Sequence, residues 1–181
     1  MREILAAIGE DPARPGLELT PRRFAESYGE FFSGLAVEPL SYLADAEQFL
    51  AVDGQLSELV LVRDIEFRSM CEHHLLPFTG VAHVGYIPRN RIVGLGRLPR
   101  VVETLSSRPQ LQERLTEEIA DTLVSGLEPL GVIVVLDAIQ SCVSARGTRQ
   151  SRSSTVTLAS RGILGEPARR AEAMALIGAR A

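Results

Sequence analysis

The spacing of hydrophobic residues predicts both helices and strands along this chain. Residues 111–127 carry leucine or isoleucine at every fourth position, which is the period of one face of a helix. Hydrophobic and polar residues alternate between 58 and 67, as in a strand with one buried face. Residues 131–139 are rich in β-branched side chains, which is typical of a strand buried on both faces.

A second helix is predicted from Thr20, because threonine can cap a helix and Pro21 suits its first turn. Phe24, Tyr28 and Phe31 then recur at helical spacing. We expect this stripe to pack on the main domain or on another subunit. The other predicted elements are helices over 2–9, 98–105 and 167–178, and strands over 80–87, 92–95 and 153–159.

The order of these elements predicts an α+β fold: an antiparallel four-stranded sheet with a helical pair on one face. Residues 1–50 would form an N-terminal helical arm, and residues 51–181 the main domain.

Composition narrows the class of protein. The chain has 181 residues, of which 45% are hydrophobic and 23% charged, as in ordinary folded domains. No apolar run approaches the roughly 20 residues that span a bilayer, so no membrane association is expected.

The presence of only two cysteines, far apart in the sequence, favours a location in the reducing cytoplasm. The net charge of −4 argues against nucleic-acid binding. All 19 basic residues are arginine, which weakens any argument from one arginine.

The stretch Ser69–His74, predicted as a turn between two strands, contains two of the three histidines and one of the two cysteines. Cys71 and His74 have the C-x-x-H spacing that lets one turn present two zinc ligands, and Cys142 can supply a third. His73 would stay unligated and free to move protons. The alternative is a pair of buried cysteines and two solvated histidines.

Arginines and a carboxylate indicate a nucleotide site. Arg97 and Arg100 stand where a short strand meets a helix, and three more arginines follow Cys142, at 146, 149 and 152. Arginine side chains suit phosphate, although each can simply be solvated. Gln112 and Glu113 begin the long helix. A carboxylate there can accept two N–H bonds from a guanine edge or merely complement the helix dipole.

Several motifs together resemble those of GTP cyclohydrolase I, in matching order over nearly the whole chain. They are Gly9–Pro12, Thr20–Arg23, Cys71–His74, Gly94–Arg97, Gln110–Thr116 and Cys142–Gly147. The resemblance implies the tunnelling fold and a homodecamer with active sites between subunits, in which strands of neighbouring subunits form a toroidal barrel. It also implies conversion of GTP to dihydroneopterin triphosphate and formate, a step towards tetrahydrofolate.

The resemblance assigns a role to each matching residue. Cys71, His74 and Cys142 match zinc ligands, and His73 matches the proton-transferring histidine. Glu113, with Gln112 beside it, matches guanine recognition. Four arginines match the triphosphate clamp: Arg23, Arg97, Arg100 and Arg146.

Three positions depart from the family pattern. Gln140 stands where the family has a second catalytic histidine, and glutamine cannot carry a proton at neutral pH. Arg97 replaces a phosphate-binding lysine, and Gly96 the serine before it. Three hypotheses follow: a cyclohydrolase acting on GTP, a relative that stops at a formamidopyrimidine nucleotide or uses another guanine nucleotide, and a catalytically silent nucleotide-binding regulator.

Overall fold

A computed structural model describes residues 1–48 and 58–179. Its helices are α1 (Arg2–Ala7), α2 (Thr20–Phe31), α3 (Arg97–Ser106), α4 (Gln112–Leu127), α5 (Ser141–Ser144) and α6 (Pro167–Gly178). Short 3₁₀ turns are η1 (Ser33–Ala36), η2 (Pro39–Leu43) and η4 (Ile163–Gly165). The strands are β1 (Glu47–Gln48), β2 (Val60–Cys71), β3 (Pro77–Ile87), β4 (Arg91–Ile92), β5 (Pro109–Gln110), β6 (Gly131–Gln140) and β7 (Thr155–Gly162).

The main sheet has the strand order β5-β2-β3-β6-β7. The four long strands pair antiparallel, which confirms the predicted α+β class. The sheet has a fifth strand that the sequence did not predict: β5 pairs parallel with β2 through only two residues. The predicted turn at Ser69–His74 also begins later, because β2 runs on to Cys71.

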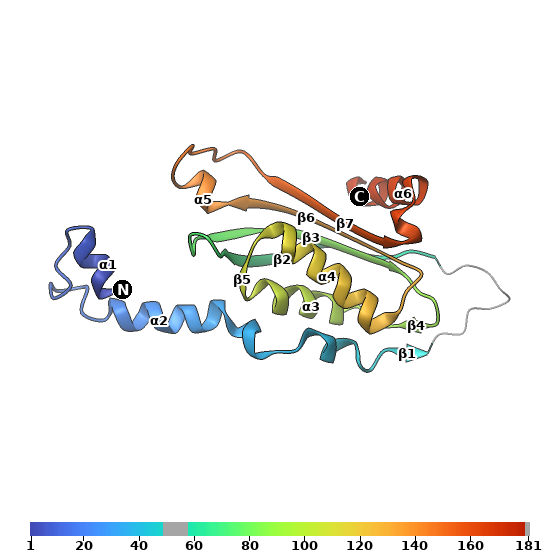
Figure 1. The fold of residues 1–181 in the computed structure, drawn as a ribbon, viewed down its shortest axis with the longest axis horizontal. Helices are drawn as coiled ribbons and strands as arrows, with labels where there is room; N and C mark the ends of the chain where they lie inside the picture. The colour runs from blue at the N-terminus through green and yellow to red at the C-terminus, as the bar shows by residue number, and fades with distance from the viewer. Residues whose placement is uncertain (49–57, 180–181) are drawn as a thin grey trace.

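The core lies mainly between this sheet and the helix pair α3 and α4, which cover one face (Figure 1). The predicted stripe of α4 is fully buried at Leu115, Ile119, Leu123 and Leu127. Strand β6 is buried on both faces, as predicted, because its alternate residues pack against a second cluster that includes α6 and η4. No helix among the described residues is long and apolar enough to cross a membrane.

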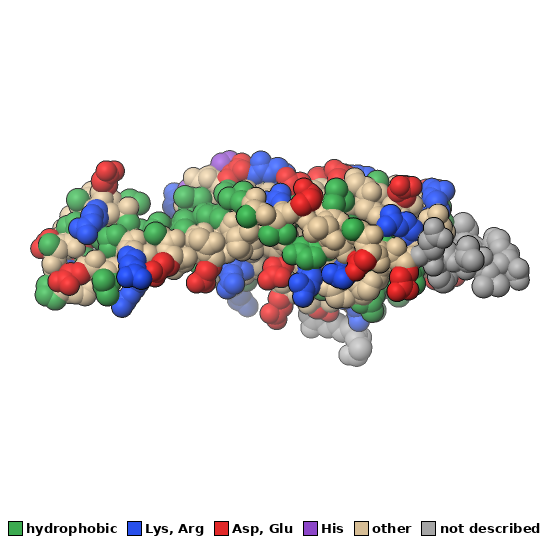
Figure 2. Space-filling view, turned by 90° about the horizontal axis from the view of Figure 1, so that it is seen from below, with side chains coloured by type: hydrophobic (Ala, Val, Ile, Leu, Met, Phe, Trp, Pro, Cys, Tyr) green, Lys and Arg blue, Asp and Glu red, His purple; other side chains and the backbone are tan. Residues whose placement is uncertain are grey.

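The N-terminal helices extend from the body as an arm (Figures 1 and 2). Helix α2 has no buried residue, so a single chain covers its aromatic stripe only in part. The Tyr28 hydroxyl donates to the Leu75 carbonyl at 3.1 Å, and the Arg68 guanidinium lies 5.8 Å from the centroid of the Phe31 ring. Leu43, by contrast, is 1% exposed within the main core. The boundary predicted between residues 50 and 51 lies outside the described residues.

The third histidine has a structural contact. His83 is buried in β3, where its Nδ1 accepts a hydrogen bond from the backbone N–H of Asp64 at 3.2 Å. Asp64 has a φ of 57° and lies at an irregularity in the β2–β3 register. This hydrogen bond satisfies a backbone donor that the bulge removes from the ladder.

Gly80 allows β3 and β6 to approach closely, and its replacement by alanine tests that constraint. A Cβ at Gly80 would lie 1.9 Å from the Asp137 carbonyl oxygen, so the strands must separate. We expect Gly80→Ala to lower the free energy of unfolding by about 3 kcal/mol, measured by urea denaturation. Gly29→Ala is the matched control, because its Cβ would meet nothing within 4 Å. Equal stability of the two variants would contradict the close approach.

Candidate metal centre and active site

A tight turn after β2 folds His74 back over Cys71. The Leu75 N–H donates to the Cys71 carbonyl at 2.7 Å, and the Cys71 N–H donates to the Leu76 carbonyl at 2.9 Å. Leu75 has a φ of 50°, the left-handed conformation that reverses the chain. The turn brings the Cys71 Sγ to 3.8 Å from the His74 Nδ1.

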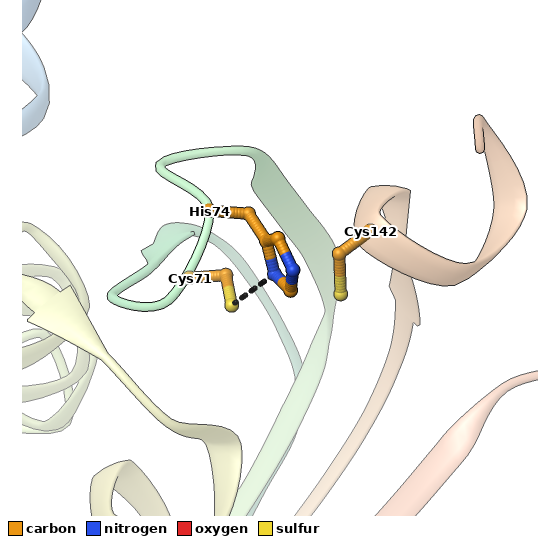
Figure 3. A group of neighbouring side chains, drawn as sticks. All are labelled: Cys71, His74 and Cys142. Atoms are coloured by element: carbon orange, nitrogen blue, oxygen red, sulfur yellow. Dashed lines mark hydrogen bonds between the residues drawn. The ribbon is translucent and has the colours of Figure 1, made fainter. Parts of the chain in front are cut away.

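Cys142 reaches the same place from the end of the neighbouring strand β6. Strand β6 pairs with β3 as far as the Phe78–Gln140 pair, and the short helix α5 follows immediately. The ligand atoms of Cys71, His74 and Cys142 all lie within 4.8 Å of one another (Figure 3). The three predicted metal ligands therefore converge, although they come from two separate parts of the chain.

The donor set and its spacing fit a zinc ion. Tetrahedral zinc, with Zn–S near 2.3 Å and Zn–N near 2.1 Å, places sulfur and nitrogen ligands about 3.6 Å apart. Burial, together with the neighbouring Cys71, raises the pKa of the Cys142 thiol. A divalent cation would remove this cost of bringing two thiolates together. Three protein ligands also leave a fourth position open, as catalytic zinc sites require.

His73 lies at the rim of the cluster and is exposed. Its Nε2 is 4.0 Å from a carboxylate oxygen of Glu72, whose other oxygen pairs with the guanidinium of Arg114. The Arg114 Nε also donates to the Gln110 side chain at 3.1 Å. These contacts attach the turn to β5 and α4.

Gln140 and Gln112 lie next to each other at this end of the sheet. The Gln140 Nε2 donates to the Gln112 Oε1 at 2.6 Å. Gln112 is only 3% exposed, whereas Glu113, the next residue of α4, is exposed. Sequence reasoning placed Gln112 beside the substrate but did not detect this hydrogen bond. A glutamine beside a helix start gives no local sign of its distant partners.

A single chain does not gather the predicted arginines around the metal centre. Helix α3 ends close to β5, which pairs with Cys71, while Arg97 is at its first residue. Ten helical residues span about 15 Å, so Arg97 lies far from the cluster. There it pairs with Asp45, and the Arg100 guanidinium lies 5.9 Å from the centroid of the Tyr42 ring.

The other two predicted arginines are on exposed segments. Arg23 is on α2 in the arm, and Arg146 follows α5. Arg146 is close enough to Cys142 to oppose the rise in its thiol pKa. Arg146 is therefore placed beside the metal cluster within one chain.

A hollow of about 490 Å³ lies between the open edge of β2 and α3. Glu66, Arg68 and Glu103 are among its lining residues, and the metal cluster is not. Within the cluster itself, Cys71 is buried, Cys142 is half-buried and His74 is exposed.

The chain combines an α+β fold with a cysteine-histidine-cysteine group that could hold a metal ion, and comparison with known sequences specifies the family. The sequence model of the GTP cyclohydrolase I family matches residues 1–178. The chain belongs to the GTP cyclohydrolase I family.

Individual relatives are similar in sequence to this chain over almost their full lengths. A GTP cyclohydrolase 1 of Leifsonia xyli is 56% identical over 176 residues, which cover 97% of this chain and 91% of the relative. A GTP cyclohydrolase 1 of Streptomyces griseus is 53% identical, with 99% and 88% covered. The protein of that name in Clostridioides difficile is 52% identical, with 98% and 92% covered.

A solved structure supports the fold. The apo form of archaeosine synthase QueF-Like superimposes with a TM-score of 0.50 at 18% identity, covering 60% of this chain and 97% of that one. The tunnelling fold expected from the sequence motifs is thereby confirmed for the chain.

Proposed function

We propose that this protein is a zinc-dependent hydrolase that opens the imidazole ring of GTP at C8. The observation that carries the proposal is the convergence of Cys71, His74 and Cys142 on one open centre in a chain of this family. The complete reaction would yield dihydroneopterin triphosphate and formate. When bound, zinc lowers the pKa of water and so supplies a nucleophile at neutral pH.

The residues around the centre have distinct roles in this proposal. His73, exposed beside the cluster, donates a proton to the ring nitrogen that leaves when the imidazole opens. The exposed carboxylate of Glu113 accepts N–H bonds from the guanine edge. Gln112 and Gln140 complete the pocket wall. Four arginines bind the triphosphate: Arg23, Arg97, Arg100 and Arg146.

The arginines support a site shared between subunits. One chain holds Arg97 and Arg100 at the opposite end of α3 from its own metal centre. A second copy that brings its α3 start to this centre would complete the triphosphate site. The same assembly would cover the aromatic stripe of α2. We therefore propose a homo-oligomer, a decamer as the family resemblance implies.

Gln140 determines how far the reaction proceeds. Its amide can form hydrogen bonds but does not exchange a proton at neutral pH. His73 would then perform the acid–base chemistry of every step. If His73 does not suffice, the reaction stops at a formamidopyrimidine nucleotide. Two further possibilities are a different guanine nucleotide as substrate and a silent nucleotide-binding regulator.

The metal centre is tested by zinc analysis of the purified protein. We expect about one zinc per chain in the wild type, and loss of most of it in His74→Ala and Cys142→Ser, since each removes one of three ligands. His73→Ala is the matched control and should keep its zinc. Wild-type protein without metal after growth in zinc-supplemented medium would contradict the proposed centre.

The reaction is tested by incubating the zinc-loaded protein with GTP. Proton NMR should show loss of the C8–H signal, and pterin absorbance and formate report the later steps. We expect Gln140→His to raise the ratio of pterin to formamidopyrimidine, because imidazole carries protons at neutral pH. Gln150→His makes the same change on an exposed loop and should leave the ratio unaltered.

Each outcome of this experiment selects one hypothesis. Fast pterin formation by the wild type would exclude the truncated reaction. Binding of GTP without loss of C8–H would favour the silent regulator. Turnover of another purine nucleotide in place of GTP would identify a changed substrate.

A further inference from the structure

The orientation of the Gln112 amide is fixed by its surroundings. Its Nε2 lies 2.8 Å from the Thr155 carbonyl oxygen and 3.3 Å from the Leu136 carbonyl oxygen. A carbonyl oxygen can only accept a hydrogen bond, so the NH₂ group of Gln112 must face these strands. Its Oε1 consequently faces the opposite way, towards Gln140.

Two threonine hydroxyls continue this arrangement without conflict. The Thr116 hydroxyl donates to the Gln112 backbone carbonyl at 2.7 Å. Its proton is used there, so the Thr157 hydroxyl donates to the Thr116 Oγ1 at 2.6 Å. The Thr157 Oγ1 remains free to accept from the Gln112 Nε2 at 3.2 Å. Each hydrogen bond of this network therefore has one direction, and the two hydrogens of the Gln112 NH₂ group are shared among three acceptors.

The same logic sets the orientation of Gln140. An amide oxygen only accepts, so the group that Gln140 turns to the Gln112 Oε1, at 2.6 Å, must be its NH₂. The Gln140 Oε1 has no donor among the described residues. Within that part of the chain, Asp137 Oδ1 is the one buried side-chain polar atom without a partner, so the Gln140 oxygen reaches solvent.

We propose that Gln112 is a positioning residue that holds Gln140 as a hydrogen-bond acceptor, so that the site prefers purine nucleotides with a hydrogen on N7. This inference rests on the proposed function, which places C8 at the metal centre. Gln140 is the last residue of β6 and Cys142 follows in α5, so a substrate with C8 at the metal centre would turn its imidazole ring towards Gln140 in this proposal.

The preference has a consequence for the reaction. The N7 of intact GTP is an acceptor and gains nothing from an oxygen that only accepts. Addition of water across the N7–C8 bond places a hydroxyl on C8 and a hydrogen on N7. Cleavage of the C8–N9 bond then moves the hydroxyl proton to N9 and leaves C8 as a formyl group on N7. Gln140 therefore stabilises the hydrated and opened forms over GTP.

The test measures binding to zinc-depleted protein, in which no turnover competes. Isothermal titration is run with GTP, with 8-oxo-GTP, whose N7 carries a hydrogen, and with 7-deaza-GTP, which has no acceptor at this position. Replacement of Gln140 by Met removes the acceptor. We expect the ratio of dissociation constants for GTP and 8-oxo-GTP to fall by about tenfold in Gln140→Met, the effect of one hydrogen bond.

Gln112→Met tests the positioning role, because Gln140 is then free to rotate. We expect a similar fall in the ratio of the dissociation constants for GTP and 8-oxo-GTP. A cooperative thermal unfolding transition checks that this variant is folded. Gln150→Met is the matched control and should keep the wild-type ratio. If Gln140 instead presented its NH₂ to the substrate, Gln140→Met would weaken the binding of GTP and leave the binding of 7-deaza-GTP unchanged. That result would overturn the proposal.

Neutron diffraction of wild-type crystals grown in heavy water supplies a measurement that no substitution can disturb. Deuterium on the Gln140 atom that faces Gln112 is expected, and an undeuterated oxygen there would overturn the inference. Failure of all three nucleotides to bind, both to the zinc-depleted protein and after zinc is restored, would refute the proposed function and the N7 preference together. The neutron result would still decide the amide orientation by itself.

Discussion

The pairing of β3 with β6 is the constraint on which the candidate site depends. Ten residues of one strand face ten of the other, from Phe78 opposite Gln140 to Ile87 opposite Gly131. The first of these pairs fixes the turn that carries Cys71 and His74 against the start of α5, which carries Cys142. The candidate metal centre is thus assembled by backbone hydrogen bonds, and Gly80 permits the close approach that they need.

Repeating patterns made most of the fold predictable from the sequence. The stripe of α4 and the alternation in β2 recur over several turns or pleats, so each additional residue strengthens the prediction. The two-residue strand β5 and the one-turn helix α5 are too short to have a period. They exist because tertiary contacts hold them, and both lie beside the metal centre.

The candidate site was predictable where residue types are rare. Two cysteines and three histidines leave few ways to build a metal centre, and the structure brings the chosen three together. The arginines gave no such guidance, because all 19 basic residues are arginine. The separation of Arg97 and Arg100 from the cluster follows from the length of α3. Gln112 acquires its role from partners on β6 and β7, which the local sequence does not reveal.

The buried hydrogen bonds that fix Gln112 also determine which other side chains could function at position 140. The Gln112 Oε1 can accept a hydrogen bond from a side chain at position 140 only if that side chain carries a donor within reach. A neutral histidine there would be held in the tautomer whose hydrogen points at Gln112, leaving its other nitrogen as a base facing the pocket. Glutamine and histidine would then present the same polarity to a bound nucleotide. The scaffold can therefore exchange a proton-transferring group for an inert one without rebuilding its pocket wall.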